Sequence, residues 1–146
     1  GDPAHTPALL RRKAFEDAMR EAGLQVPPHR VAQGYFTYRS GLDAARQLLA
    51  QTPRPRAIFA SNDDMAAATL AVAHGMGLQV PAELSVRGFG GTPVATTVWP
   101  ELTTIHQPFA AIVEGAIDLM QSRFLDPDAA PAVRIYPCHI VDRGTL

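Results

Sequence analysis

The side chains best suited to binding a small molecule fall in three short stretches of the sequence. Arg11 lies in the first predicted helix, Phe36 follows the apolar residues 31–34, and Ser61-Asn-Asp-Asp64 follows the apolar residues 57–60. These stretches offer a planar cationic donor, an aromatic stacking face and carboxylate acceptors. In doubly wound α/β folds, ligands bind beyond the C-terminal ends of the strands, where loops enter helices. The three stretches are therefore candidates for one binding site.

Patterns that would support catalysis are missing from the sequence. Cys138 is the only cysteine, so an intrachain disulfide and a cysteine zinc cluster are excluded. The five histidines show no His-x-x-x-His spacing, and the glycines of residues 34–41 come without a phosphate-loop lysine. A Gly-x-Ser-x-Gly elbow is also absent. We expect a protein that is not an enzyme and that needs no metal or cofactor.

Composition favours one domain, or a large part of one. The chain has 146 residues, of which 47% are hydrophobic, and 13 basic residues against 14 acidic ones give a formal net charge of −1. Without a basic run, this stretch should not hold DNA by itself. A signal-peptide core or membrane-spanning stretch is not recognisable in it, so we expect a cytoplasmic protein.

Apolar periodicity predicts alternating helices and strands. Helices are expected over residues 6–22, 40–51, 62–77 and 108–124, with Gly23 closing the first and Ser40 capping the second. Strands are expected over residues 31–34, 57–60, 84–88 and 103–106, with a flexible turn at 88–91 and two strand pieces within 132–141. This order predicts an α/β fold, a parallel sheet flanked by helices.

Three runs of residues carry a family resemblance. Phe59–Ala68, Val80–Phe89 and Pro100–Pro108 resemble successive signatures of LacI/GalR transcription regulators, in the same order and at matching separations. The closing residues Ile140–Thr145 are similar to the terminal strand of that family. Together the runs are far more specific than any one of them.

The resemblance implies one incomplete lobe of a two-lobed periplasmic-binding-protein-like type I fold. Residues 1–105 would form the C-terminal lobe without its first strand, residues 106–125 a helix of the other lobe, and residues 126–146 the return to the C-terminal lobe. The implied function is effector sensing: a sugar or purine would control DNA binding by an N-terminal helix-turn-helix in a homodimer. A sugar-binding protein of a transporter shares the fold and is the alternative, and an α/β enzyme of flavodoxin-like build is a third class.

The same resemblance implies the roles of three residues. Asp63 would accept hydrogen bonds from effector hydroxyl or ring N–H groups, Arg11 would grip oxygen atoms, and Phe36 would stack on the effector. Phe36 as a core residue is an equal alternative, and helix capping, assigned here to Ser61 and Asp64, competes for Asp63. Gly90-Gly91 departs from the family, which commonly has an acidic or amide residue there.

The third predicted helix also carries the expected dimer surface. Met65, Leu70, Val72 and Met76 offer more apolar surface than one side of a helix needs. The alternative is that all four belong to the core of the lobe.

Overall fold

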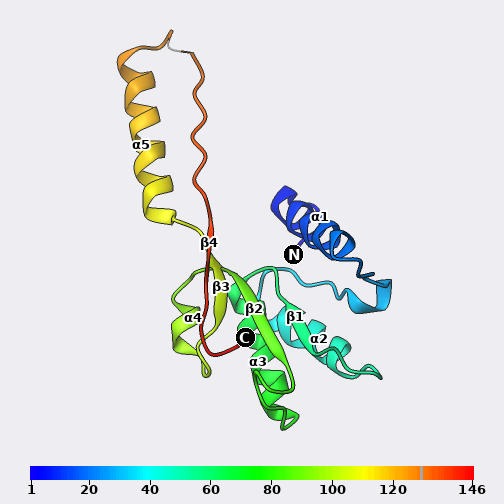
Figure 1. Ribbon diagram of the computed structural model, residues 1–146. Coiled ribbons are helices and arrows are strands. Elements are labelled where there is room, and N and C mark those ends of the chain that lie inside the picture. Colours follow the sequence, from blue (N-terminus) through cyan, green and yellow to red (C-terminus); the bar gives the residue numbers. More distant parts are fainter. Residues whose placement is uncertain (129) are drawn as a thin grey trace.

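The strands form one sheet in the order β1-β2-β3-β4, as Figure 1 shows for the computed structural model, which describes residues 1–128 and 130–146. The strands are β1 (Ala57–Phe59), β2 (Ser85–Gly90), β3 (Thr103–His106) and β4 (His139–Val141). The helices are α1 (Thr6–Glu21), α2 (Tyr38–Leu49), α3 (Asp63–Gly75), α4 (Val94–Thr97) and α5 (Phe109–Leu125), with a 3-10 turn at Pro28–Arg30. No helix in this described part of the chain is long and apolar enough to cross a membrane.

The sheet confirms the α/β class predicted from the alternating pattern. β1 pairs in parallel with β2 and β2 with β3, whereas β4 runs antiparallel on β3 with Ile140 opposite Ile105. Near the chain end, Thr145 bonds to β2 and β3: its carbonyl accepts from Val86 N at 2.9 Å and its hydroxyl accepts from Thr103 N at 2.9 Å. The closing residues therefore bond to β2 and β3, while their assignment to the C-terminal lobe stays a prediction.

The core lies between the sheet and the helix pair α2 and α3. It is centred on Leu49, Leu70, Leu84, Val86 and Leu102, all almost fully buried. Gly41 allows α2 to approach α3 closely, since a side chain at this position would collide with the backbone of Met65. Strand β2 forms part of the sheet side of this core. Its residues alternate in burial, with Val86, Gly88 and Gly90 buried.

This packing corrects the expected dimer surface on α3. Met65, Leu70 and Val72 are buried in the core, so they are not available to a second subunit. Met76 alone of the four is exposed, at 43%. Alanines over much of α3 let it sit tightly between the sheet and α2, and its longer apolar side chains fill the core there.

Helix α1 lies on the other side of the sheet (Figure 1). Its ring of Phe15 stacks on Phe59 of β1 with centroids 5.8 Å apart. Leu9 remains 54% exposed, although it belongs to the apolar face predicted for this helix. The helix ends as expected, with Gly23 in the left-handed region (φ 73°) directly after the C-cap Ala22.

Helix α5 and the returning extended segment form an arm that projects from the sheet (Figure 1). An Arg134–Asp118 ion pair of 2.9 Å joins the two, and Tyr136 packs where Gly115 leaves room. The apolar side chains along α5 are largely exposed, Val113 by 56%. The placement of this helix in a second lobe therefore stays a prediction.

Two predicted strands are wrong in their extent. Residues 31–34 join no strand in the described part of the chain, and of residues 132–141 only His139–Val141 pair. Conversely, Phe89 and Gly90, expected in a flexible turn, belong to β2, and the short helix α4 was not predicted. A strand needs a neighbour for its hydrogen bonds, which an apolar run alone does not supply.

The N-caps predicted for α2 and α3 are also wrong. Thr37 caps α2, its side chain accepting from Ser40 N, so Ser40 is inside the helix. Asn62 caps α3, with its side-chain oxygen accepting from Met65 N at 3.0 Å, in place of Ser61. Asp64 instead accepts a 3.3 Å hydrogen bond from the Asn62 amide. Several Ser, Thr and Asn residues compete at each helix start, and the backbone path decides between them.

Candidate functional site

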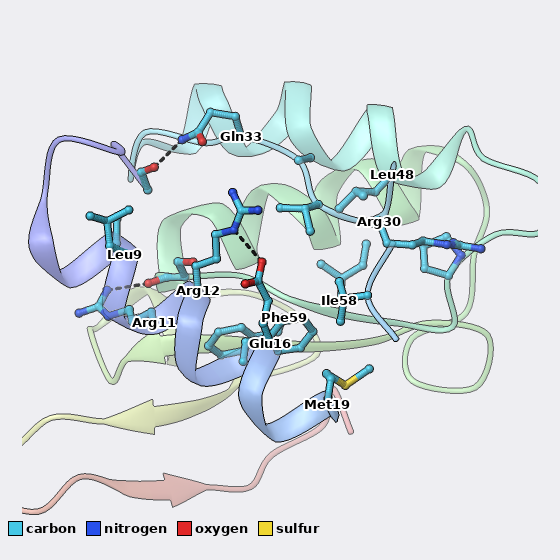
Figure 2. Close-up of a pocket in the computed structure, with 18 of the residues that line it drawn as sticks. Leu9, Arg11, Arg12, Glu16, Met19, Arg30, Gln33, Leu48, Ile58 and Phe59 are labelled. Carbon is cyan, nitrogen blue, oxygen red and sulfur yellow. Dashed lines mark hydrogen bonds and ion pairs between the residues drawn. The ribbon is translucent and has the colours of Figure 1, made fainter. Parts of the chain in front are cut away.

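Arg11 occupies the centre of the candidate site and joins several elements. Its guanidinium carbon lies 3.8 Å from the centroid of the Phe89 ring in β2 and 5.6 Å from that of Phe36. Its Nη1 donates to the Ser61 carbonyl oxygen at 2.7 Å (Figure 2). Desolvation lowers the pKa of Arg11 from its usual value, while Cys138 and Asp63 act in the opposite direction. The result is a partly buried cation held between aromatic faces.

Phe36 is held in a strained conformation beside Arg11. Its φ of 61° is in the left-handed region, which costs a residue with a side chain about 1–3 kcal/mol. The Asn62 amide donates to its carbonyl oxygen at 2.9 Å, and its ring covers Gly1, where any side chain would collide with it. The ring also packs partly against the core. The two predicted roles of Phe36, core packing and site residue, are thus compatible.

Asp63 lies at the first position of α3 and is only 1% exposed. Its Oδ2 accepts from Thr92 N at 2.7 Å and from the Thr92 hydroxyl at 3.0 Å, and its Oδ1 accepts from the Thr104 hydroxyl. Gly88 makes the space, because a side chain there would overlap Asp63 Oδ1. Most of the acceptor capacity of the carboxylate therefore serves the fold. Whether it also contacts a ligand stays a prediction.

Two histidines lie side by side on β3 and β4, at the same end of the sheet. His106 on β3 and His139 on β4 are register partners, with ring centroids 5.1 Å apart. Gly91 (φ 72°) packs on His106 so closely that a side chain would overlap the ring. The glycine that departs from the family pattern is thus required here by both its backbone and its neighbour.

The structure brings Arg11 and Phe36 together, with Asp63 nearby but turned toward Thr92 and Thr104. Phe89 was missed as a site residue, although its place near the end of a predicted strand was a signal. The partners of Asp63 gave no signal, since they lie 29 and 41 residues away in sequence. Among the described residues, no group of three or more His, Cys, Asp or Glu side chains could hold a metal ion.

The full length of the chain, residues 1–146, matches the family of periplasmic binding protein-like domains. The chain belongs to this family. Within it, the chain is an effector-binding domain of the LacI-family type. This agrees with the resemblance of its three sequence signatures.

Similar curated proteins are repressors. The chain is 40% identical over 122 residues to the ribose operon repressor of Escherichia coli (strain K12), covering 84% of this chain and 37% of that protein. It is 39% identical over 137 residues to the HTH-type transcriptional repressor PurR of Escherichia fergusonii, covering 93% of this chain and 40% of that protein. The chain thus spans only 37% to 40% of the length of these relatives.

Similar solved structures agree on the fold. A complex of the transcriptional regulator CelR with cellobiose is 28% identical and superposes with a TM-score of 0.93, over 99% of this chain and 44% of that one. A LacI-type transcription regulator from Bifidobacterium animalis subsp. lactis is 29% identical, with a TM-score of 0.89 over 99% of this chain and 52% of that one.

Proposed function

We propose that this chain is the effector-sensing part of a LacI-type transcription regulator and that it binds a small molecule beside Arg11, Phe36 and Phe89. The observation that carries the proposal is the guanidinium of Arg11, which lies 3.8 Å from the Phe89 ring centroid while its Nη1 donates to Ser61. A planar cation fixed in this way is ready to donate to ligand oxygens without losing further side-chain freedom.

The effector in this proposal is a sugar or a purine. The aromatic rings of Phe36 and Phe89 suit the flat face of either, and the guanidinium suits hydroxyl or carbonyl oxygens. The ribose operon repressor and the cellobiose-bound regulator CelR support a sugar by their names. Gly90 and Gly91 contribute no side chain, so ligand contacts at this edge would come from backbone groups and from His106.

Regulation would come from the closure of two lobes on the effector. In this proposal the exposed apolar face of α5 is covered by the second lobe, and the altered lobe angle changes the spacing of DNA-binding heads in a homodimer. By thermodynamic linkage, operator DNA would change effector affinity by the same factor. Such a regulator has no catalytic step and would work in the cytoplasm.

The proposal is tested on the full-length protein in two stages. A thermal-shift screen with sugars and purines identifies a ligand, and calorimetric titration then compares Arg11→Ala with Arg12→Ala. Arg12 is the matched control, because it is the neighbouring arginine of the same helix, its side chain is 58% exposed, and it already pairs with Glu16 at 2.8 Å. Losing hydrogen bonds to a charged group costs about 1.5–3 kcal/mol, so Arg11→Ala should weaken binding roughly 10-fold to 100-fold. Equal affinities of the two variants would refute the site.

A further inference from the structure

Two imidazole rings meet where the chain passes between the sheet and the projecting arm. His106 is the last residue of β3, just before α5 begins at Phe109, and His139 is the first residue of β4, where the returning segment rejoins the sheet (Figure 1). The two histidines are register partners on antiparallel strands, so their side chains point to the same face of the sheet. Because they lie far apart in the sequence, no local spacing motif predicted the pair.

The separation of the two rings matches that of two histidines bound to one metal ion. Their centroids lie 5.1 Å apart, and the ring planes are tilted by 54° from each other. With a Zn–N distance of about 2.0–2.1 Å and a tetrahedral angle at the metal, the centroids of two coordinating imidazoles lie about 5.2 Å apart. The strands therefore already hold the rings at the distance that a shared ion requires.

The ring nitrogens of the pair are available to a ligand. In the described part of the chain, neither imidazole takes part in a hydrogen bond or an ion pair. His139 is exposed and His106 is half-buried, so an ion can approach from solvent. Gly91 packs against the Nδ1 side of the His106 ring, where a side chain would overlap it. This contact orients the ring and leaves Nε2 as the nitrogen of His106 that is free to coordinate.

The charges around the pair suit a cation. Thr104 lies on the same face of β3 as His106, and its hydroxyl donates to the buried carboxylate of Asp63. The guanidinium of Arg11 lies over the ring of Phe89, which points to the opposite face of the sheet. A negative charge therefore lies on the side of the histidine pair, and the sheet separates the pair from this positive one.

We propose that His106 and His139 bind one divalent transition-metal ion of the zinc type, each through one imidazole nitrogen. Imidazole suits zinc, nickel and copper ions, whereas magnesium prefers oxygen ligands. No further His, Cys, Asp or Glu side chain of the described residues joins the pair, so water completes the coordination. A bound ion would tie the strand that leads to α5 to the strand that returns from it. The inference is independent of the effector and of any role in transcription.

Calorimetric titration of the chain with Zn²⁺, and separately with Mg²⁺, tests the site. One Zn²⁺ should bind per chain, and Mg²⁺ should not bind. His139→Gln keeps an exposed polar side chain but removes one ligand, so Zn²⁺ affinity should fall at least about 10-fold, a loss that even an outer-shell partner typically causes. His74→Gln is the matched control, because His74 is exposed at the end of α3, and its affinity should equal that of the parent.

Cys138 needs a control of its own, because its exposed thiol is a possible zinc ligand next to His139. Side chains alternate along an extended segment, so the thiol should point away from the histidine pair. Cys138→Ser should therefore bind Zn²⁺ as tightly as the parent. A loss of affinity in this variant as large as in His139→Gln would contradict the proposed ligand pair.

NMR of the parent chain gives a second readout that does not depend on how a variant folds. On addition of Zn²⁺, the ring nitrogen signals of both His106 and His139 should shift, while those of His74 should stay in place. A shift at only one of the two rings, or equal Zn²⁺ affinities of the parent and His139→Gln, would overturn the proposal. Shifts at both rings together with the loss of affinity in His139→Gln support it.

Discussion

Replacing Asp63 with asparagine should destabilise the fold, because its carboxylate joins α3 to both the β2–α4 loop and β3. The carboxylate accepts from Thr92 N, from the Thr92 hydroxyl and from the Thr104 hydroxyl in a site that is almost fully buried. An asparagine keeps the shape but offers one oxygen, and its amide group then faces a hydroxyl or an N–H donor.

The magnitude follows from the hydrogen bonds that lose their charge. Bonds to a charged group contribute about 1.5–3 kcal/mol and neutral ones about 0.5–1.5, so each of these bonds weakens by roughly 1 kcal/mol. Removing the cost of burying the charge offsets part of this loss. We expect Asp63→Asn to lower the free energy of unfolding by about 2–3 kcal/mol, or the melting temperature by roughly 4–12 °C for a domain of this size.

Urea denaturation of the 146-residue chain measures this effect, with Asp64→Asn as the matched control. The Asp64 carboxylate accepts a long hydrogen bond of 3.3 Å from the Asn62 amide. The free energy of unfolding of Asp64→Asn should therefore fall by less than about 1 kcal/mol, chiefly because the favourable interaction of the charge with the helix dipole is lost. If the two variants unfold at the same urea concentration, the structural role assigned to Asp63 is wrong.

Three further predictions concern the same contacts, the arm and DNA. Gly88→Ala should lower the free energy of unfolding by about 1–3 kcal/mol, because the new methyl group collides with Asp63 Oδ1 and Leu102; urea denaturation should show this, and an unchanged midpoint would contradict it. Val113→Asp should leave the stability of residues 1–146 within about 0.5 kcal/mol of the parent but lower that of the full-length protein by about 1.5–3 kcal/mol in thermal melts, if a second lobe covers α5. In gel-shift titrations, residues 1–146 should bind a DNA duplex only weakly and in a salt-sensitive manner, and specific binding would overturn the assignment of DNA recognition to a separate domain.

The sequence by itself determined the order of the elements, the class of fold and part of the site. Apolar periodicity is a local property, so the helices α1, α2, α3 and α5 and the strands β1, β2 and β3 were predicted with small errors at their ends. The three signature runs indicated the family for the same reason: each is a contiguous stretch. The stretches that hold Arg11 and Phe36 were chosen from their positions near strand ends, and the family resemblance implied the roles of the two residues. The structure does bring them together, with Arg11 also against the Phe89 ring.

Only the tertiary structure decided which distant groups meet. The hydrogen-bond partners of Asp63, Thr92 and Thr104, lie much later in the chain. The local sequence around Asp63 does not distinguish a carboxylate bound by these threonines from one that faces a ligand. Residues 31–34 have the composition of a strand, yet strand formation depends on a partner that composition does not provide. Hydrogen-bond pairing and burial are properties of the assembled sheet, and for this reason they could not be derived from the residues one stretch at a time.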